Sequence, residues 1–355
     1  MKVAVYTIAL NEEKFVKRWY ESAKDADYLL IADTGSTDGT QETAKSLGIN
    51  VLDVRVRPWR FDDARNASLV ALPEDVDYCI SLDMDEILLP GWRKSLEKAL
   101  EQNITRPRYK YTWSWSNAEE TEPGLQYGGD KIHSRKGYRW THPVHEVLKT
   151  YGEVEEAQGW VDLEIHHHPD NSKSRGQYFP LLAMAVAEAP YDDRNAYYYA
   201  RELYFYGRYE EAIREFKRHL GLPTANWAPE RAASMRYLAK IEKDKKEEWL
   251  VKAHMEAPWR REALVELAQH FYEQESWASC NHFAKKAIAI EEKPLDYLCE
   301  DFAWGALPYD LAAISAYYLE NYNEAYKYGN TACQLNPTDE RLKTNLRYYS
   351  VAVSS

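Results

Sequence analysis

The sequence predicts an α/β domain followed by an all-α domain. In the first half of the chain, short apolar runs typical of buried strands alternate with helical segments, an order that favours a parallel sheet. From about Tyr191 the strand patterns stop, and helical segments rich in Ala, Tyr and Leu follow one another. We therefore expect the α/β domain to cover residues 1–190 and the helical domain to cover residues 191–355.

The composition restricts the class of protein. The chain has 355 residues, enough for two domains, and a formal net charge of −12 without any Lys/Arg-rich block. This charge disfavours a broad surface for nucleic acid or anionic membranes. The four cysteines form no C-x-x-C pair, which disfavours a disulfide framework or a zinc cluster. Because no segment approaches the roughly 20 apolar residues of a membrane span, and because the first apolar run is short for a signal peptide, we expect a cytoplasmic protein.

Four strands are expected in the first domain. Apolar runs place them at residues 3–9, 28–32, 50–54 and 76–82. Asn11 is expected to cap the helix after the first strand, because Glu12 and Glu13 suit the positive end of a helix dipole. Ligands of a parallel sheet bind at the carboxyl ends of its strands, so the polar loops that follow these strands form the candidate site.

Three such loops cover residues 10–13, 33–36 and 83–85. A nucleotide is their natural occupant, but no glycine-rich phosphate-binding pattern is present, so the diphosphate needs another source of positive charge. Asp83 and Asp85 lie on the same side of an extended chain. Carboxylate oxygens are ligands that Mg²⁺ and Mn²⁺ prefer. A solvated acidic turn would give the same D-x-D tripeptide, so the pair alone does not distinguish a metal site from such a turn.

Four motifs, in this order, resemble glycosyltransferase family 2, whose catalytic domain has the GT-A fold with a Rossmann-type mixed sheet. The motifs are Asn11-Glu12-Glu13, Asp33-Thr34-Gly35-Ser36-Thr37-Asp38-Gly39-Thr40, Ala64-Arg65-Asn66 and Leu82-Asp83-Met84-Asp85-Glu86. The resemblance implies a metal-dependent, inverting transfer of a sugar from a nucleotide sugar, with a UDP-linked donor expected, to a hydroxyl acceptor.

The same resemblance implies roles for individual residues. The residues expected to hold the nucleotide base or to lie beside the nucleotide are Leu10, Asn11, Glu13, Asp33 and Arg65. Asp83 and Asp85 are expected to bind the ribose and the metal on the diphosphate. For Arg65, a surface ion pair with Asp62 or Asp63 is the structural alternative.

The segment Trp140-Thr141-His142-Pro143-Val144-His145-Glu146 resembles a W-x-x-P-V-H-E element in a bacterial branch of the family. Inverting transfer needs one base that takes the proton of the acceptor hydroxyl. Glu146 is the expected base. Asp85, Glu86 and His145 are the alternatives, and a structural role of His145 and Glu146 in bracing the loop also stays open.

A further expected strand ends in His166, His167 and His168. Imidazole suits Mn²⁺ better than Mg²⁺, and many GT-A enzymes supply a late histidine as a third protein ligand of the metal. The related pattern falls on His167, while strand alternation directs His166 and His168 to the opposite face. The sequence leaves open which histidine binds.

Lys173 and Arg175 belong to a short basic loop after these histidines. This loop is expected to close over the diphosphate leaving group. A solvated charged loop is the alternative.

Small residues in the second half recur with the tetratricopeptide period. Ala253 and Ala287 are 34 residues apart. A third unit, with Ala332, is offset by about eleven further residues, inserted near residues 296–307. Stacked helix pairs form a concave surface for a protein partner or for a second copy of the chain. A purely structural helical cap on the catalytic domain is the alternative.

The sequence fits two other functions less well than sugar transfer. A nucleotidyltransferase needs a glycine-rich, basic loop after the first strand, and residues 9–13 do not provide one. A repeat scaffold with an inactive transferase-like domain is disfavoured because the acids, Arg65 and the His-Glu pair are retained. The sequence does not identify the acceptor, which is a glycan, a lipid-linked core, a protein or a modified base.

Overall fold

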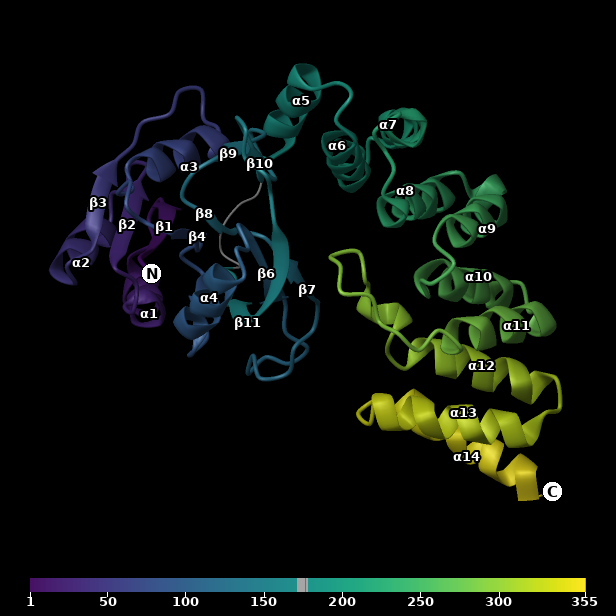
Figure 1. Ribbon diagram of the computed structural model, residues 1–355. Helices are drawn as coiled ribbons and strands as arrows, with labels where there is room; N and C mark the ends of the chain where they lie inside the picture. The colour runs from purple at the N-terminus through teal and green to yellow at the C-terminus, as the bar shows by residue number, and fades with distance from the viewer. Residues whose placement is uncertain (171–175, 177, 355) are drawn as a thin grey trace. The chain divides into compact units, whose positions relative to one another are not determined.

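The computed structural model describes residues 1–170, 176 and 178–354. The chain forms two compact units, Met1–Ala185 and Val186–Ser355. The boundary between the two units lies between Ala185 and Val186. The boundary expected from the sequence, between residues 190 and 191, is five residues further along the chain, in the connection after helix α5 (Tyr178–Glu188). The first unit is built on sheets, and the second consists of helices (Figure 1).

The main sheet of the first unit has the strand order β3-β2-β1-β4-β8. Its strands are β1 (Val3–Ala9), β2 (Tyr28–Asp33), β3 (Asn50–Asp53), β4 (Tyr78–Ser81) and β8 (Ile132–Ser134), and the helices that connect the first four are α1 (Glu13–Ala23), α2 (Thr40–Ser46) and α3 (Phe61–Val70). β1 to β4 are parallel, and β8 pairs antiparallel with β4. The four predicted strands are confirmed, since each observed strand lies in its expected range or ends one residue beyond it.

A second sheet has the order β5-β11-β6-β7. Its strands are β5 (Glu86–Leu88), β6 (Arg106–Thr112), β7 (Gln126–Gly129) and β11 (Gln158–His167). β11 runs parallel to β6 and antiparallel to β5. Helix α4 (Trp92–Glu101) packs on β11, and a ribbon of β9 (Tyr138–Thr141) and β10 (Val147–Thr150) packs through β9 on α3. The unit is therefore a mixed α/β domain, as expected.

The central strand β1 is buried on both faces, which explains its continuous apolar sequence. Val5 belongs to a core that also contains Trp19 of α1. Tyr6, on the opposite face, belongs to a core with Leu69 of α3 and Trp140 of β9. Because other elements cover both faces of the sheet, the polar loops meet at the ends of its strands.

The second unit is a series of helix pairs (Figure 1). Its helices after α5 are α6 (Asp193–Phe205), α7 (Tyr209–Gly221), α8 (Ala228–Ile241), α9 (Lys246–Glu256), α10 (Glu262–Glu273), α11 (Trp277–Ile288), α12 (Leu307–Tyr318), α13 (Tyr322–Leu335) and α14 (Glu340–Ser354), with short 3-10 helices η1 (Lys243–Lys245) and η2 (Asp301–Ala303). The periodic small residues Ala253, Ala287 and Ala332 lie in α9, α11 and α13 and are fully buried. The expected all-α repeat architecture is confirmed.

The connection of residues 289–306, between α11 and α12, contains the insertion that the broken repeat spacing predicts. Among the residues that the structure describes, no helix has both the length and the apolar character needed to cross a membrane.

Candidate functional site

The loops after β1 and β2 are fastened to each other. The backbone N–H of Asn11 donates to Ser36 Oγ at 2.9 Å, and the N–H of Thr37 donates to Asn11 Oδ1 at 2.8 Å. The N–H of Gly39 donates to Glu13 Oε2 at 3.2 Å. Asn11 and Glu13 therefore hold the two loops together, and beside them the Leu10 side chain is 51% exposed.

Asp33 stands at the end of β2 and has no accessible surface. Its Oδ1 accepts hydrogen bonds from the N–H groups of Gly35 and Ser36, both at 3.0 Å, and from Gln41 Nε2 at 2.9 Å. Burial opposes the charge, but hydrogen bonds from Ser36 and Gln41 outweigh it and lower the pKa of Asp33. Its Oδ2 is buried and accepts from no group in the described part of the chain. A buried acceptor of this kind suits a ligand donor.

Arg65 lies on α3 beside the end of β4 and is only 6% exposed. Its Nε donates to Glu146 Oε1 at 2.5 Å, its Nη1 to Ser81 Oγ at 2.8 Å and its Nη2 to Asp83 Oδ1 at 2.7 Å. The guanidinium also lies over the Trp140 ring, 5.1 Å from its centroid. One arginine thus connects the D-x-D loop to the loop that carries Glu146.

The surface ion pair considered for Arg65 is not the arrangement found. Asp62 pairs with Arg60, with 2.9 Å between Arg60 Nη2 and Asp62 Oδ2.

Lys131 is a functional candidate that sequence reasoning missed. It directly precedes β8, and its Nζ donates to Asp83 Oδ2 at 2.6 Å and to Glu86 Oε1 at 2.9 Å. Burial opposes ionisation of Asp83, but the charges of Arg65 and Lys131 outweigh it and lower the pKa of Asp83 well below its usual range. The available signal was a lone lysine after a glycine-rich loop, and only the pairing of β8 with β4 brings it to the site.

Asp85, in the same loop, contacts His167 at the end of β11. The distance from His167 Nε2 to Asp85 Oδ2 is 3.3 Å. The other ring nitrogen, Nδ1, lies 2.9 Å from the carbonyl oxygen of Trp113 and must donate to it, because a carbonyl oxygen only accepts. Burial opposes the charge, but the hydrogen bond to Asp85 outweighs it and raises the pKa of His167, so the protonated ring donates from Nε2 to Asp85, and the neutral ring has a lone pair on Nε2 for an ion. Metal-binding histidines show this arrangement, with one ring N–H given to a carbonyl and the other nitrogen free to ligate.

The three expected metal ligands do not converge. Both oxygens of Asp83 are engaged by Arg65 and Lys131, and no group of three His, Cys, Asp or Glu side chains arranged for a metal occurs among the described residues. Asp85 and His167 alone fit a divalent ion. Two ligands about 2.1 Å from an octahedral ion stand roughly 3.0 Å apart at adjacent positions, close to the 3.3 Å observed.

His166 and His168 lie apart from this pair, as strand alternation predicts. His166 Nε2 is 3.0 Å from Glu164 Oε1. His168 pairs with Glu120 and stacks on Trp115, with the ring centroids 5.2 Å apart.

The expected base Glu146 follows β9 in a loop. Its side chain is nearly buried and accepts from Arg65. Of the alternatives, Glu86 is fully buried and receives hydrogen bonds from the Tyr111 hydroxyl at 2.6 Å and from the Asp83 N–H at 2.8 Å, besides that from Lys131. His145 packs edge-on against Tyr178. Lys173 and Arg175 lie outside the described residues.

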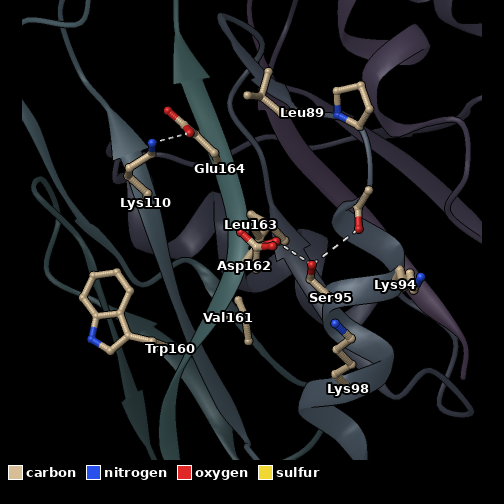
Figure 2. A pocket seen from close by; sticks show the side chains of 12 residues that line it. Leu89, Lys94, Ser95, Lys98, Lys110, Trp160, Val161, Asp162, Leu163 and Glu164 are labelled. Atoms are coloured by element: carbon tan, nitrogen blue, oxygen red, sulfur yellow. Dashed lines mark hydrogen bonds and ion pairs between the residues drawn. The ribbon is translucent and has the colours of Figure 1, made fainter.

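A cavity of about 600 Å³ lies elsewhere in the first unit. It lies between α4 and strands β6 and β11, and none of the expected site residues lines it (Figure 2). Several of its polar groups bond to one another, since Lys110 pairs with Glu164 at 2.6 Å and Ser95 Oγ donates to the Asp162 carbonyl. The candidate site is therefore the loop cluster at the strand ends, and not this cavity.

Comparison with known proteins agrees with the loop motifs. Residues 4–142 match the family model described as Glycosyl transferase family 2, which confirms the resemblance seen in the sequence and supports a glycosyltransferase. No curated protein matches the chain.

Solved structures resemble each part of the chain at low similarity. Glucosyl-3-phosphoglycerate synthase from Mycobacterium tuberculosis, in complex with Mn²⁺, UDP and glucosyl-3-phosphoglycerate, is 23% identical over 38% of this chain and 57% of that chain, with a TM-score of 0.29. The pilF protein of Pseudomonas aeruginosa is 18% identical over 48% of this chain and 72% of that chain, with a TM-score of 0.37. The first TPR domain of human RPAP3 is 17% identical over 36% of this chain and 94% of that chain, with a TM-score of 0.30.

Proposed function

We propose that the first unit, in which residues 4–142 match glycosyl transferase family 2, moves a sugar from a nucleotide sugar to a hydroxyl group with inversion at the anomeric carbon. The pair of Asp85 and His167 carries the proposal. It offers one oxygen and one nitrogen ligand, 3.3 Å apart, at the edge of an α/β sheet where nucleotides bind. Two further buried groups at the strand ends, Arg65 and Asp33, supply the charge and the acceptor that a nucleotide needs.

Asp33 supports uracil as the base of the donor. Its Oδ2 is a buried acceptor without a described partner, while Oδ1 is held by the loop backbone. The imide N–H of uracil is a donor that such an oxygen accepts, whereas the corresponding ring nitrogen of cytosine is itself an acceptor. Guanine N1–H donates as well, so the resemblance to the family decides in favour of uracil. We therefore propose a UDP-linked sugar, with Leu10, Asn11 and Glu13 beside the base.

Asp85 and His167 would hold a divalent ion, Mn²⁺ in preference to Mg²⁺ because one ligand is an imidazole. When bound, this ion would neutralise the diphosphate leaving group. Asp83 is kept ionised by Arg65 and Lys131, and each of its oxygens retains a lone pair with which to accept a ribose hydroxyl.

Glu146 is proposed as the base. The acceptor oxygen forms a bond to the anomeric carbon, the bond to the diphosphate oxygen breaks with its electron pair on the diphosphate, and the hydroxyl proton passes to Glu146. Arg65 fixes the Glu146 carboxylate by one hydrogen bond to Oε1. Glu86 is a weaker candidate, because its carboxylate is already bound by three groups of the protein.

Thermal unfolding with a panel of nucleotide sugars tests the proposal. With Mn²⁺ and a UDP-sugar at about 100 times its Kd, linkage gives about 2.7 kcal/mol of stabilisation, which raises the Tm of a unit of this size by about 5 °C or more. Asp85→Asn is expected to abolish this Mn²⁺-dependent shift and the hydrolysis of the donor.

The matched control is Asp75→Asn, which removes an exposed carboxylate from the same unit and leaves the shift intact. A full shift in Asp85→Asn, or donor hydrolysis untouched by a chelator, rules out the metal role. No shift with any nucleotide sugar would point instead to an inactive transferase-like domain.

A further inference from the structure

Residues 290–304, here called the inserted segment, lie along the first helices of successive pairs in the helical unit. Tyr297 in this segment stacks on Tyr198 of α6, with ring centroids 6.1 Å apart and planes 14° apart. Its hydroxyl donates to Glu230 of α8, and its ring also contacts Trp227, just before α8. One aromatic side chain thus joins two neighbouring pairs.

Carboxylates of the inserted segment pair with buried arginines. Arg260 Nη1 donates to Asp296 Oδ2 at 2.5 Å, and Arg236 Nη1 donates to Glu300 Oε1 at 2.6 Å. Both guanidiniums are at most 5% exposed, and Arg236 is also held by Glu266. A buried guanidinium is costly unless its donors are paired, so the two acids complete the hydrogen bonding of this surface.

The contacts continue to both ends of the inserted segment. The N–H of Glu300 donates to Glu262 Oε1 of α10 at 3.1 Å. Arg261, before α10, donates to the carbonyl of Ile290 at 2.7 Å and lies over the Trp304 ring, 4.2 Å from its centroid. The inserted segment therefore contacts α6, α8 and the start of α10 through side chains and backbone.

The chemistry of these contacts is that of a binding interface. Residues 291–304 contain five carboxylates against one lysine, and they face a surface provided with arginines and tyrosines. Tyr, Trp and Arg are the residues that dominate protein–protein hot spots, and they make these contacts beside the buried apolar residues Leu298 and Ala303 of the inserted segment. Because this surface carries arginines, a ligand that binds to it needs negative charge.

We propose that the inserted segment is an internal ligand of the inner face formed by α6, α8 and the start of α10. It occupies the surface on which an acidic, aromatic-containing segment of a protein partner would lie, so that a partner binds there only after displacing it. A segment tethered at both ends competes at an effective concentration on the order of millimolar. A free segment with micromolar intrinsic affinity therefore binds the intact chain on the order of 1000-fold more weakly than an opened one.

The cysteines provide a test on the full chain. Cys299 lies in the inserted segment and is 1% exposed, Cys280 lies in α11 with no exposure, and Cys333 is half-buried. Site-resolved labelling with a thiol reagent is expected to modify Cys333 quickly and the other two slowly. A synthetic peptide of residues 290–304, with serine in place of its cysteine, should speed labelling of Cys299 at least tenfold at millimolar concentration and leave Cys280 unchanged.

Two variants of the inserted segment provide a second test, by measuring how tightly the peptide binds. Tyr297→Ala removes the stacking on α6 and should let the same peptide, carrying a fluorophore, bind at least tenfold more tightly by fluorescence anisotropy. Asp296→Ala removes one of the two carboxylates that pair with Arg260, the other being Glu262, and should act in the same direction. A scrambled peptide of the same composition is the control.

Three results would overturn the proposal. Labelling of Cys299 as fast as that of Cys333 in the wild type would show that the inserted segment is not seated. Labelling of Cys299 that stays unchanged up to millimolar peptide would show a structural connection that no ligand displaces. Equal binding of the scrambled peptide would show charge attraction alone. Because the first two results come from the wild-type chain, the test does not depend on how well the variants fold.

Discussion

Asp83 is a carboxylate whose two oxygens face two different cations. Arg65 is 2.7 Å from Oδ1, and Lys131 is 2.6 Å from Oδ2. The same ammonium is 2.9 Å from the buried Glu86. These charges keep the D-x-D loop in place before any ligand arrives. The D-x-D motif, which predicts a metal site in the sequence, thus also supplies an acid to an internal network of ion pairs.

Lys131→Met is expected to lower the free energy of unfolding by about 3 kcal/mol, because Glu86 stays buried without its cation. Lys110→Met is the matched control. Lys110 Nζ is 2.6 Å from Glu164, but the lysine side chain is 47% exposed, and exposed pairs contribute less than about 1 kcal/mol. Urea unfolding of the full chain measures both. Equal losses in the two variants would show that the pairing of Lys131 contributes no more than a surface pair.

His133 predicts a pH dependence of stability. The ring is fully buried and contacts the rings of Tyr6 and Tyr138, and burial lowers the pKa of His133 to about 4. The unfolded chain, with a histidine pKa near 6.5, therefore binds more protons than the folded chain below that pH. The stabilisation is present above pH 6.5 and is lost as the pH falls toward 4, by up to about 3 kcal/mol.

Urea midpoints at pH 7 and pH 4.5 test this. His133→Gln removes the titrating group, so its midpoint should change less between the two pH values than that of the wild type. Parallel changes in the two proteins would contradict the assignment to His133, and would direct attention to other groups, such as His219, whose pKa burial also lowers to about 4.

At the scale of elements, α1 holds the end of β4 in place. Trp19 of α1 is fully buried, and its Nε1 donates to the carbonyl of Leu82 at 2.9 Å, one residue before Asp83. Trp19→Phe removes this donor and leaves a buried carbonyl unpaired, at a cost of about 2 kcal/mol. Because that carbonyl precedes the D-x-D loop, the variant should also weaken the Mn²⁺-dependent stabilisation by UDP.

Trp92→Phe is the matched control, since Trp92 of α4 makes a similar bond, Nε1 to the Ser22 carbonyl at 3.2 Å. Trp92→Phe should lower the free energy of unfolding but leave the Mn²⁺-dependent stabilisation by UDP unchanged. Thermal unfolding with and without UDP and Mn²⁺ distinguishes the two. If both variants keep the nucleotide effect, α1 does not position the loop.

The elements also show what local sequence predicts. β1 to β4 follow from short apolar runs, which are local signals. Asn11 does not cap α1 as expected, because its side chain accepts from the Thr37 N–H of the next loop instead. β8 has three residues, and nothing local indicates that it pairs with β4. Lys131 therefore escaped prediction, while Asp83, which it neutralises, did not. The contact of Asp85 with His167 joins residues 82 positions apart, and only the resemblance to a family pointed to it.

The same reasoning applies to the helical unit. The 34-residue spacing of Ala253 and Ala287 predicts the stacked pairs, because small residues must recur where helices approach closely. The break in that spacing locates the insertion between α11 and α12. Its path along α6, α8 and α10 depends on pairings such as Asp296 with Arg260, which no periodicity contains.

At the scale of the whole molecule, the structure predicts that the helical unit folds by itself. It has its own buried cores, and the residues just before α6 bond within it. Arg218 Nη1 donates to the Pro190 carbonyl at 2.7 Å, Thr224 Oγ1 donates to the Tyr191 carbonyl at 2.6 Å, and the Asp192 side chain caps α6 by accepting from the Asn195 N–H at 2.9 Å. A fragment of residues 189–355 keeps all three bonds.

This fragment is expected to give a helical circular dichroism spectrum and a cooperative thermal transition. A fragment of residues 195–355 loses the cap and both carbonyl partners, so it should be less stable by at least about 1 kcal/mol, the usual contribution of an N-cap. Comparing the two fragments separates a domain boundary near residue 190 from one inside α6. Equal stability of the two would place the boundary later, and failure of the longer fragment to fold would show that the helical unit depends on residues before 189.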